Sequence, residues 1–211
     1  MMNKTISMFT GILLYCSIAA NASAAWIDWS STTSGTMDYY GSSVNVSLSG
    51  PALDLVNGDY YYNNAYTGGT SPTGTYAGLA PSDLIRVNST GTFTLTFDAQ
   101  VDDLYMALVS VGQPSRNFVT YDFNNSFDVV SAGPNYWGYN GYTTTGNSLT
   151  GQEFNGILSF AGSYSSISFD VVNAENWHGF NFGTVDVPEP AALLLLASGL
   201  LGISLTRKRK I

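Results

Sequence analysis

The sequence predicts an all-β fold: a single β-sandwich, jelly-roll or immunoglobulin-like in topology, between two apolar end segments. Three observations predict this fold. Short segments alternate apolar and polar residues with a period near two, Gly and Asn separate these segments, and no long amphipathic helix pattern occurs between the two ends. Hydrophobic residues make up 45% of the 211 residues, which is enough for one packed core in a body at residues 25–186.

The N-terminal segment, residues 1–24, has the three parts of a secretory signal peptide. A basic start precedes an apolar run at about residues 6–20, and small residues in an Ala-x-Ala pattern follow. The small side chains of Ala22 and Ala24 suit the peptidase pocket, so we expect cleavage before Ala25, with a cut after Ala25 as the alternative. The general secretion machinery is therefore an expected partner.

The clearest alternating strand lies at residues 92–97, where Phe93, Leu95 and Phe97 fall on one face. Val, Ile, Thr, Tyr and Phe are abundant in this segment and in others like it, and these residues favour strands. Further strands of this kind are predicted at residues 43–48, 118–123, 127–131, 154–160, 166–171 and 179–185.

Residues 105–111 are nearly all apolar and predict a strand that is buried on both faces. Asp102 and Asp103 separate this strand from the one at residues 92–97, so we expect a hairpin or tight loop there. Gly162 marks another expected break between strands.

Charge is distributed unevenly along the chain. Only Arg86 and Arg116 are basic between the two end segments, against 14 of the 15 acidic residues, which gives the body a formal charge of −12. Such a body repels nucleic acid, so nucleic-acid binding is excluded. The single cysteine, Cys16, lies in the predicted signal peptide, which leaves the exported body without disulfides or thiol chemistry.

Motifs for catalysis are sparse. His178 is the only histidine, and the chain has neither a Gly-x-Ser-x-Gly nor a His-Glu-x-x-His motif. We therefore expect a protein that is not an enzyme. A carboxylate-based glycoside hydrolase remains an alternative, because the separation of two carboxylates in space cannot be read from sequence.

Asp98, Asp102 and Asp103 place several carboxylate oxygens in a short stretch, and oxygen ligands are those that calcium prefers. Acidic residues are also common in β-turns, so the expectation is no cofactor, with calcium at these three residues as the alternative.

Four aromatic residues gather in a stretch that is rich in Gly and Asn. Exposed rings with amide and hydroxyl neighbours can stack on sugar rings, and rings of this kind can equally cover the end of a sandwich core. The residues of this candidate carbohydrate contact are Tyr136, Trp137, Tyr139 and Tyr142.

The C-terminal segment, residues 187–211, combines three features in a fixed order. Pro188, Glu189 and Pro190 form an extended motif, because proline opposes helix. An apolar run at about residues 191–205 predicts a transmembrane helix that spans about 22 Å, short of a hydrocarbon core of about 30 Å. A basic cluster then stops the chain on the cytoplasmic side. This cluster consists of Arg207, Lys208, Arg209 and Lys210.

Together the two ends resemble those of the PEP-CTERM proteins of Gram-negative bacteria, over about 25 residues at the C-terminus. The resemblance implies that a membrane enzyme, an exosortase, recognises and cleaves the tag around Pro188, Glu189 and Pro190. It also implies a transient stay in the inner membrane, followed by the outer surface or extracellular matrix. Residues 151–156 and 177–180 are similar to the last part of the body in many such proteins, and no activity is implied for them.

We therefore expect an exported cell-surface or extracellular-matrix protein with a structural or interaction role. It would be sorted by an exosortase and associated with exopolysaccharide in biofilm. The alternatives are a carbohydrate-binding module on the same tag and a secreted polysaccharide hydrolase.

Overall fold

Strands account for most of the chain that the structure describes. No described residue lies in a helix, so the predicted all-β class is confirmed. Within the described residues, none belongs to a helix with the length and apolar character that membrane crossing requires. All of the described residues belong to one compact unit, Ala22–Val187. This computed structural model describes residues 23–51, 53–56, 79, 83–133, 141–173 and 175–186.

The described strands are short near the N-terminus and long near the centre of the fold. In chain order they are β1 (Ser23–Trp26), β2 (Asp28–Trp29), β3 (Ser34–Tyr39), β4 (Ser42–Ser49), β5 (Leu53–Val56), β6 (Leu84–Val87), β7 (Gly91–Val111), β8 (Val119–Phe123), β9 (Asp128–Ala132), β10 (Gly141–Thr145), β11 (Ser148–Gln152), β12 (Phe154–Val171) and β13 (His178–Asp186).

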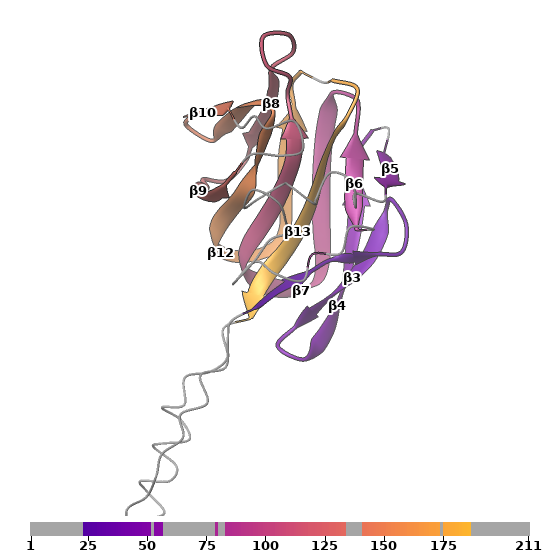
Figure 1. The fold of residues 1–211 in the computed structure, drawn as a ribbon. Coiled ribbons are helices and arrows are strands. Elements are labelled where there is room, and N and C mark those ends of the chain that lie inside the picture. Colours follow the sequence, from indigo (N-terminus) through magenta and orange to yellow (C-terminus); the bar gives the residue numbers. More distant parts are fainter. Residues whose placement is uncertain are drawn as a thin grey trace, which may run out of the picture. The chain divides into compact units, whose positions relative to one another are not determined.

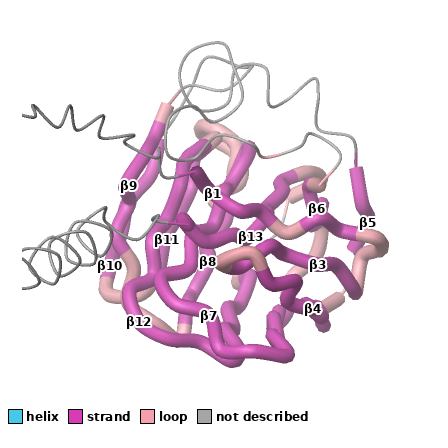
Figure 2. The backbone as a smooth tube through the Cα atoms, turned by 90° about the horizontal axis from the view of Figure 1, so that it is seen from below, coloured by secondary structure: helices cyan, strands magenta, loops and turns pink. Residues whose placement is uncertain are grey.

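All of these strands pair antiparallel in one sheet. The main path runs β10-β11-β8-β12-β7-β13-β6-β5. Of the remaining strands, β4 pairs with β7, β9 with β12 and β1 with β13, while β3 pairs with β4 and β2 with β3. Figures 1 and 2 both show β9 and β10 on the opposite side of the domain from β4 and β5. The two strands in the middle of this path, β7 and β12, therefore hold the sheet together.

The ladder between β7 and β12 joins two halves of the sheet, one with β4 and β8 and the other with β13 and β9 (Figure 1). Near Gly91, β7 lies between β12 and β4, whereas near Val111 it lies between β12 and β13. β12 changes neighbours in the same way, from β8 near Val171 to β9 near Phe154. Each long strand thus belongs to both halves of the sheet.

Aromatic rings from both halves meet in one core. Phe93 of β7 stacks on its cross-strand partner Phe169 of β12, with ring centroids 5.2 Å apart. Phe180 of β13 meets Phe93 and Phe169 edge-on, at 6.1 and 5.3 Å. Stacked and edge-on arrangements are the favourable geometries of aromatic pairs. The two halves therefore share one apolar interior, while the jelly-roll or immunoglobulin-like topology stays a prediction.

The second half of β7 is buried on both faces, as the sequence predicts. Met106 and Leu108 face the main core, and Ala107 and Val109 pack in a second apolar cluster that includes Trp26 of β1. The near-continuous apolar run at residues 105–111 follows from these two interiors.

The predicted hairpin at Asp102 and Asp103 is wrong, because β7 continues through both residues. Asp103 has a left-handed φ of 50°, and the facing strand carries register shifts around Gly162. Pairing continues through these irregularities, since Val101 still pairs with Tyr164, and the ladder bends there. Phe93 before the bend therefore meets Phe180, the cross-strand partner of Leu108 after it. Gly162 likewise lies within β12, where it takes part in a bulge rather than separating two strands.

The other predicted strands are found within one residue at each end in β4, β8, β9 and β13, and residues 92–97 and 105–111 lie within β7. Residues 154–160 and 166–171 were predicted as two strands and form one, β12. The sequence pattern did not predict β1, β2, β3, β5, β6, β10 and β11.

Candidate functional site

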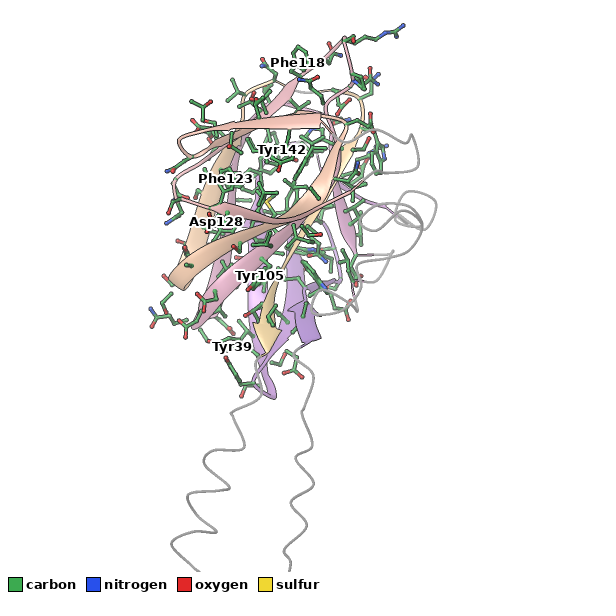
Figure 3. The ribbon with its side chains drawn as sticks, turned by 60° about the vertical axis from the view of Figure 1, so that its left-hand side comes forward. Tyr39, Tyr105, Phe118, Phe123, Asp128 and Tyr142 are labelled. Atoms are coloured by element: carbon green, nitrogen blue, oxygen red, sulfur yellow. The ribbon has the colours of Figure 1, made fainter. Side chains whose placement is uncertain are left out.

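A pocket of about 400 Å³ lies at the Val111 end of the β7–β12 ladder. Its walls come from the end of β7, the β7–β8 connection, the residue between β11 and β12, and the β12–β13 connection. Phe118, which belongs to the same β7–β8 connection, lies at the opposite end of the domain from Tyr39 (Figure 3). The lining residues are Ser110, Gln113, Pro114, Arg116, Glu153, Glu175, Asn176 and Trp177.

The backbone leaves regular strand geometry where the pocket forms. Ser110 and Glu153 have left-handed φ values of 55° and 66°, which are uncommon for residues other than glycine. Gly112, with a φ of 82°, approaches the carbonyl of Gly151 so closely that an added Cβ would lie 2.1 Å from its oxygen. The end of β7 and the residue before β12 therefore leave the ladder at the same level, which brings the side chains of Ser110 and Glu153 together.

The fully buried Asn155 side chain forms hydrogen bonds to the backbone of both Ser110 and Glu153. Its Oδ1 accepts a hydrogen bond from the Ser110 amide at 2.8 Å, and its Nδ2 donates to the Glu153 carbonyl at 2.8 Å. The Glu153 amide donates to the Gly112 carbonyl at 2.9 Å. These bonds satisfy backbone groups that the irregular strands would otherwise leave without partners.

Two glutamates of the pocket are almost completely buried, with exposed fractions of 5% for Glu153 and 6% for Glu175. The Ser110 hydroxyl donates to Glu153 Oε1, and the Gly112 amide donates to Glu175 Oε1. Loss of solvation by burial raises the pKa of Glu175 to about 8; the Gly112 hydrogen bond opposes the shift and the charge of Glu153 adds to it. At neutral pH Glu175 therefore keeps its proton and can donate as well as accept.

His178 and Tyr121 form a second buried polar contact. Nδ1 of His178 lies 2.7 Å from the Tyr121 hydroxyl, and the two rings meet edge-on. Burial lowers the pKa of His178 to about 3, so the ring is neutral, and its Nε2 has no hydrogen-bond partner among the described residues. Burial raises the pKa of Tyr121, and the charge of Glu175 contributes to that rise. His178 opens β13 within the core and does not line the pocket.

Of the four aromatic residues predicted to contact carbohydrate, only Tyr142 lies in the described part of the chain. It belongs to β10, is 40% exposed, and its ring centroid lies 4.8 Å from that of Phe154. Tyr136, Trp137 and Tyr139 lie outside the described residues.

The three predicted calcium ligands lie on β7 and have separate protein partners. Asp98 accepts from the Asn45 amide at 2.9 Å, and Asp103 accepts from the Gly162 amide at 3.1 Å. Asp102 accepts from the Tyr39 and Ser163 hydroxyls. In the described ranges no three His, Cys, Asp or Glu side chains are grouped to hold a metal ion. The calcium prediction thus gains no support from the geometry.

Sequence reasoning did not find the pocket. Nothing in the chain selects Glu153 and Glu175 from the other acidic residues, because the fold alone brings them together. The segments at residues 151–156 and 177–180, which are similar to the last part of the body in many PEP-CTERM proteins, include Glu153 and Trp177, but the resemblance implied no activity for them.

The predicted processing sites lie at the margins of the described chain. Ala24 and Ala25 belong to β1, where Ala24 pairs with Val185 of β13. Ala22, the Pro188–Pro190 motif and the predicted helix at about residues 191–205 lie outside the described residues, as does the basic cluster that follows.

Comparison with known proteins identifies one segment. Residues 186–210 match the family model of the PEP-CTERM protein-sorting motif. No curated protein and no solved structure gave a significant match to the chain. The match coincides with the residues on which the sequence resemblance rests, so the chain is identified as a protein that carries the PEP-CTERM sorting motif.

Proposed function

We propose that this chain is an exported cell-surface or extracellular-matrix protein that an exosortase sorts and cleaves. The match to the sorting motif at residues 186–210 carries this proposal, because the motif indicates an exported protein that is sorted to the cell envelope. Export by the secretion machinery, a transient membrane helix and release into an exopolysaccharide layer are the further steps of the proposal.

The position of the motif supports cleavage without damage to the domain. The last strand, β13, ends at Asp186, where the motif match begins. β13 is held by backbone pairing with β6 up to Phe180, with β7 up to Thr184 and with β1 up to Asp186. Removal of the residues after the Pro-Glu-Pro motif would therefore leave every described strand in place.

For the β domain we propose a structural or interaction role in the matrix. Charged residues make up only 10% of the chain, so most of the polar surface is built from neutral hydroxyl and amide groups. The core rings shared by the two halves of the sheet support a sandwich, whose stability would come from packing and strand pairing rather than from disulfides.

The mass of the mature protein tests the sorting proposal. We expect loss of both ends, leaving a product from about residue 25 to near residue 188. Replacement of Pro188 and Pro190 by alanine should leave the tail attached, whereas Pro114→Ala, a proline outside the motif, should be processed normally. A wild-type product that still ends at Ile211 would show a permanent membrane anchor instead.

An assay for hydrolysis tests the absence of enzymatic activity. We expect no release of reducing ends when the purified protein is incubated with neutral or acidic polysaccharides. Release that disappears in both Glu153→Gln and Glu175→Gln would replace the interaction role with that of a hydrolase that uses this carboxylate pair.

A further inference from the structure

We propose that the pocket lined by Glu153, Glu175 and Trp177 binds one neutral sugar ring of a polysaccharide. This assignment rests on the proposed matrix location for the source of its ligand, and it adds a site and a ligand class. None of the pocket residues belongs to the aromatic cluster that the sequence predicts around Trp137.

The size and lining of the pocket fit a small polar ligand with one apolar face. Its volume of about 400 Å³ falls within the usual range for small-molecule sites. Trp177, half-buried in the wall, supplies an aromatic surface of the kind that packs against the C–H face of a sugar. Gln113 and Asn176 add amide groups that both donate and accept hydrogen bonds.

The two carboxyl groups are held in place before any ligand arrives. Glu153 is fixed by the Ser110 hydroxyl, and Glu175 by the Gly112 amide. A carboxyl group has more acceptor positions than one donor fills, so each can also accept from a ligand hydroxyl. Adjacent hydroxyls of a sugar present several donors and acceptors a short distance apart, and two neighbouring carboxyl groups can form hydrogen bonds with them.

Packing alone does not account for this arrangement. Burial of a carboxyl group lowers stability unless its hydrogen bonds are replaced, and left-handed backbone at Ser110 and Glu153 adds strain. Apolar side chains would close this end of the core without either disadvantage. Strain and buried titratable groups that coincide in one pocket are typical of a binding site.

The charges of the pocket favour a neutral ligand. Burial and the charge of Glu153 raise the pKa of Glu175 to about 8, so Glu175 keeps its proton at neutral pH. Arg116 is the one basic side chain among the lining residues, which include two acidic ones. An anionic sugar would also meet the field of a body with a formal charge of −12.

The test is a titration of the full chain, kept soluble in a detergent without sugar headgroups. The probes are the methyl glycosides of glucose, galactose and mannose, and N-acetylglucosamine, with glucuronic acid and glucosamine as charged comparisons. Binding is followed by saturation-transfer NMR. We expect saturable binding of at least one neutral probe, and weaker binding of both charged probes.

Variants of pocket residues locate the binding site. Glu153→Gln and Trp177→Leu should weaken the binding by about tenfold or more. Gln113→Ala, outside the strands, should weaken it by about threefold and covers the case in which Trp177→Leu does not fold. Asp98→Asn, an exposed acid on β7 outside the pocket, should leave affinity unchanged.

Three results would overturn the assignment: no saturable binding of any neutral probe to the folded chain, affinity unchanged in Glu153→Gln and Gln113→Ala, or a charged probe that binds more tightly than every neutral one. The mass measurement on the exported protein is independent of these results. A correctly processed protein that binds no sugar rejects the pocket alone, and a sugar-binding protein with an intact tail rejects only the cleavage.

Discussion

The two ends of the β7–β12 ladder are built on different principles. At the end near Gly91 and Val171 the strands pair in regular register, and the buried face carries Phe93 stacked on Phe169. Every inward side chain there is apolar, and the alternating pattern of the sequence follows from that one requirement.

At the other end of the ladder, regular pairing stops and polar groups enter the interior. The register shifts beside Phe154, two residues have left-handed backbone, and Glu153 and Asn155 are buried. Within one ladder, apolar packing therefore determines the residues at the Gly91 end, whereas the Val111 end positions polar groups. Substitutions at the two ends should therefore differ in size and in pH dependence.

The largest effect is expected at the aromatic end. Phe169→Ala should lower the free energy of unfolding by about 3–5 kcal/mol, because it removes a fully packed ring that contacts Phe93, Phe180 and Tyr121. Urea unfolding of the full chain measures this loss. Phe169→Leu, which keeps much of the volume, should lose less than about 2 kcal/mol, and an equal loss in both variants would contradict a packing origin.

A smaller loss is expected at the polar end. Asn155→Ala removes the partners of the Ser110 amide and the Glu153 carbonyl, and should cost about 1–3 kcal/mol in the same measurement. Asn45→Ala is the matched control, since its amide side chain bonds the exposed Asp98 and should cost less than about 1 kcal/mol. Similar losses in both variants would mean that the buried network adds nothing.

The same contrast explains which parts of the fold could be predicted from sequence. At the aromatic end one physical rule, the burial of alternate side chains, determines Phe93, Leu95 and Phe97, and period-two alternation reveals it. The strand β10 was missed because four of its five residues are exposed and polar or aromatic, so it shows no alternation. The bend at Asp103 was read as a turn because acidic residues favour both.

The candidate site could not be predicted, because it depends on contacts between distant segments. Glu175 reaches the Gly112 amide across 63 positions of sequence, and Ser110 reaches Glu153 across 43. Neither residue type nor local spacing records such a contact. The sorting motif is the opposite case, since its features follow one another along the chain and are recognised by the sequence alone.

The smallest expected effect is a dependence of stability on pH that comes from the polar end. The folded chain raises the pKa of Glu175 from 4.5 to about 8 and lowers that of His178 from 6.5 to about 3. The stability that the folded state gains from protonated Glu175 is complete below about pH 4.5 and is lost as the pH rises to about 8. The stability that the folded state gains from neutral His178 is complete above about pH 6.5 and is lost as the pH falls to about 3.

These two dependences have opposite signs where they overlap, so they should largely cancel between about pH 4.5 and 6.5. Above that range Glu175 acts alone, and stability should fall by at most about 1.4 kcal/mol per pH unit until about pH 8. Urea unfolding across this range should show the fall in the wild-type chain and in Asp98→Asn. Glu175→Gln cannot lose a proton and should stay level above about pH 6.5. A fall of the same slope in Glu175→Gln would assign the pH dependence to another group and remove the distinction between the two ends.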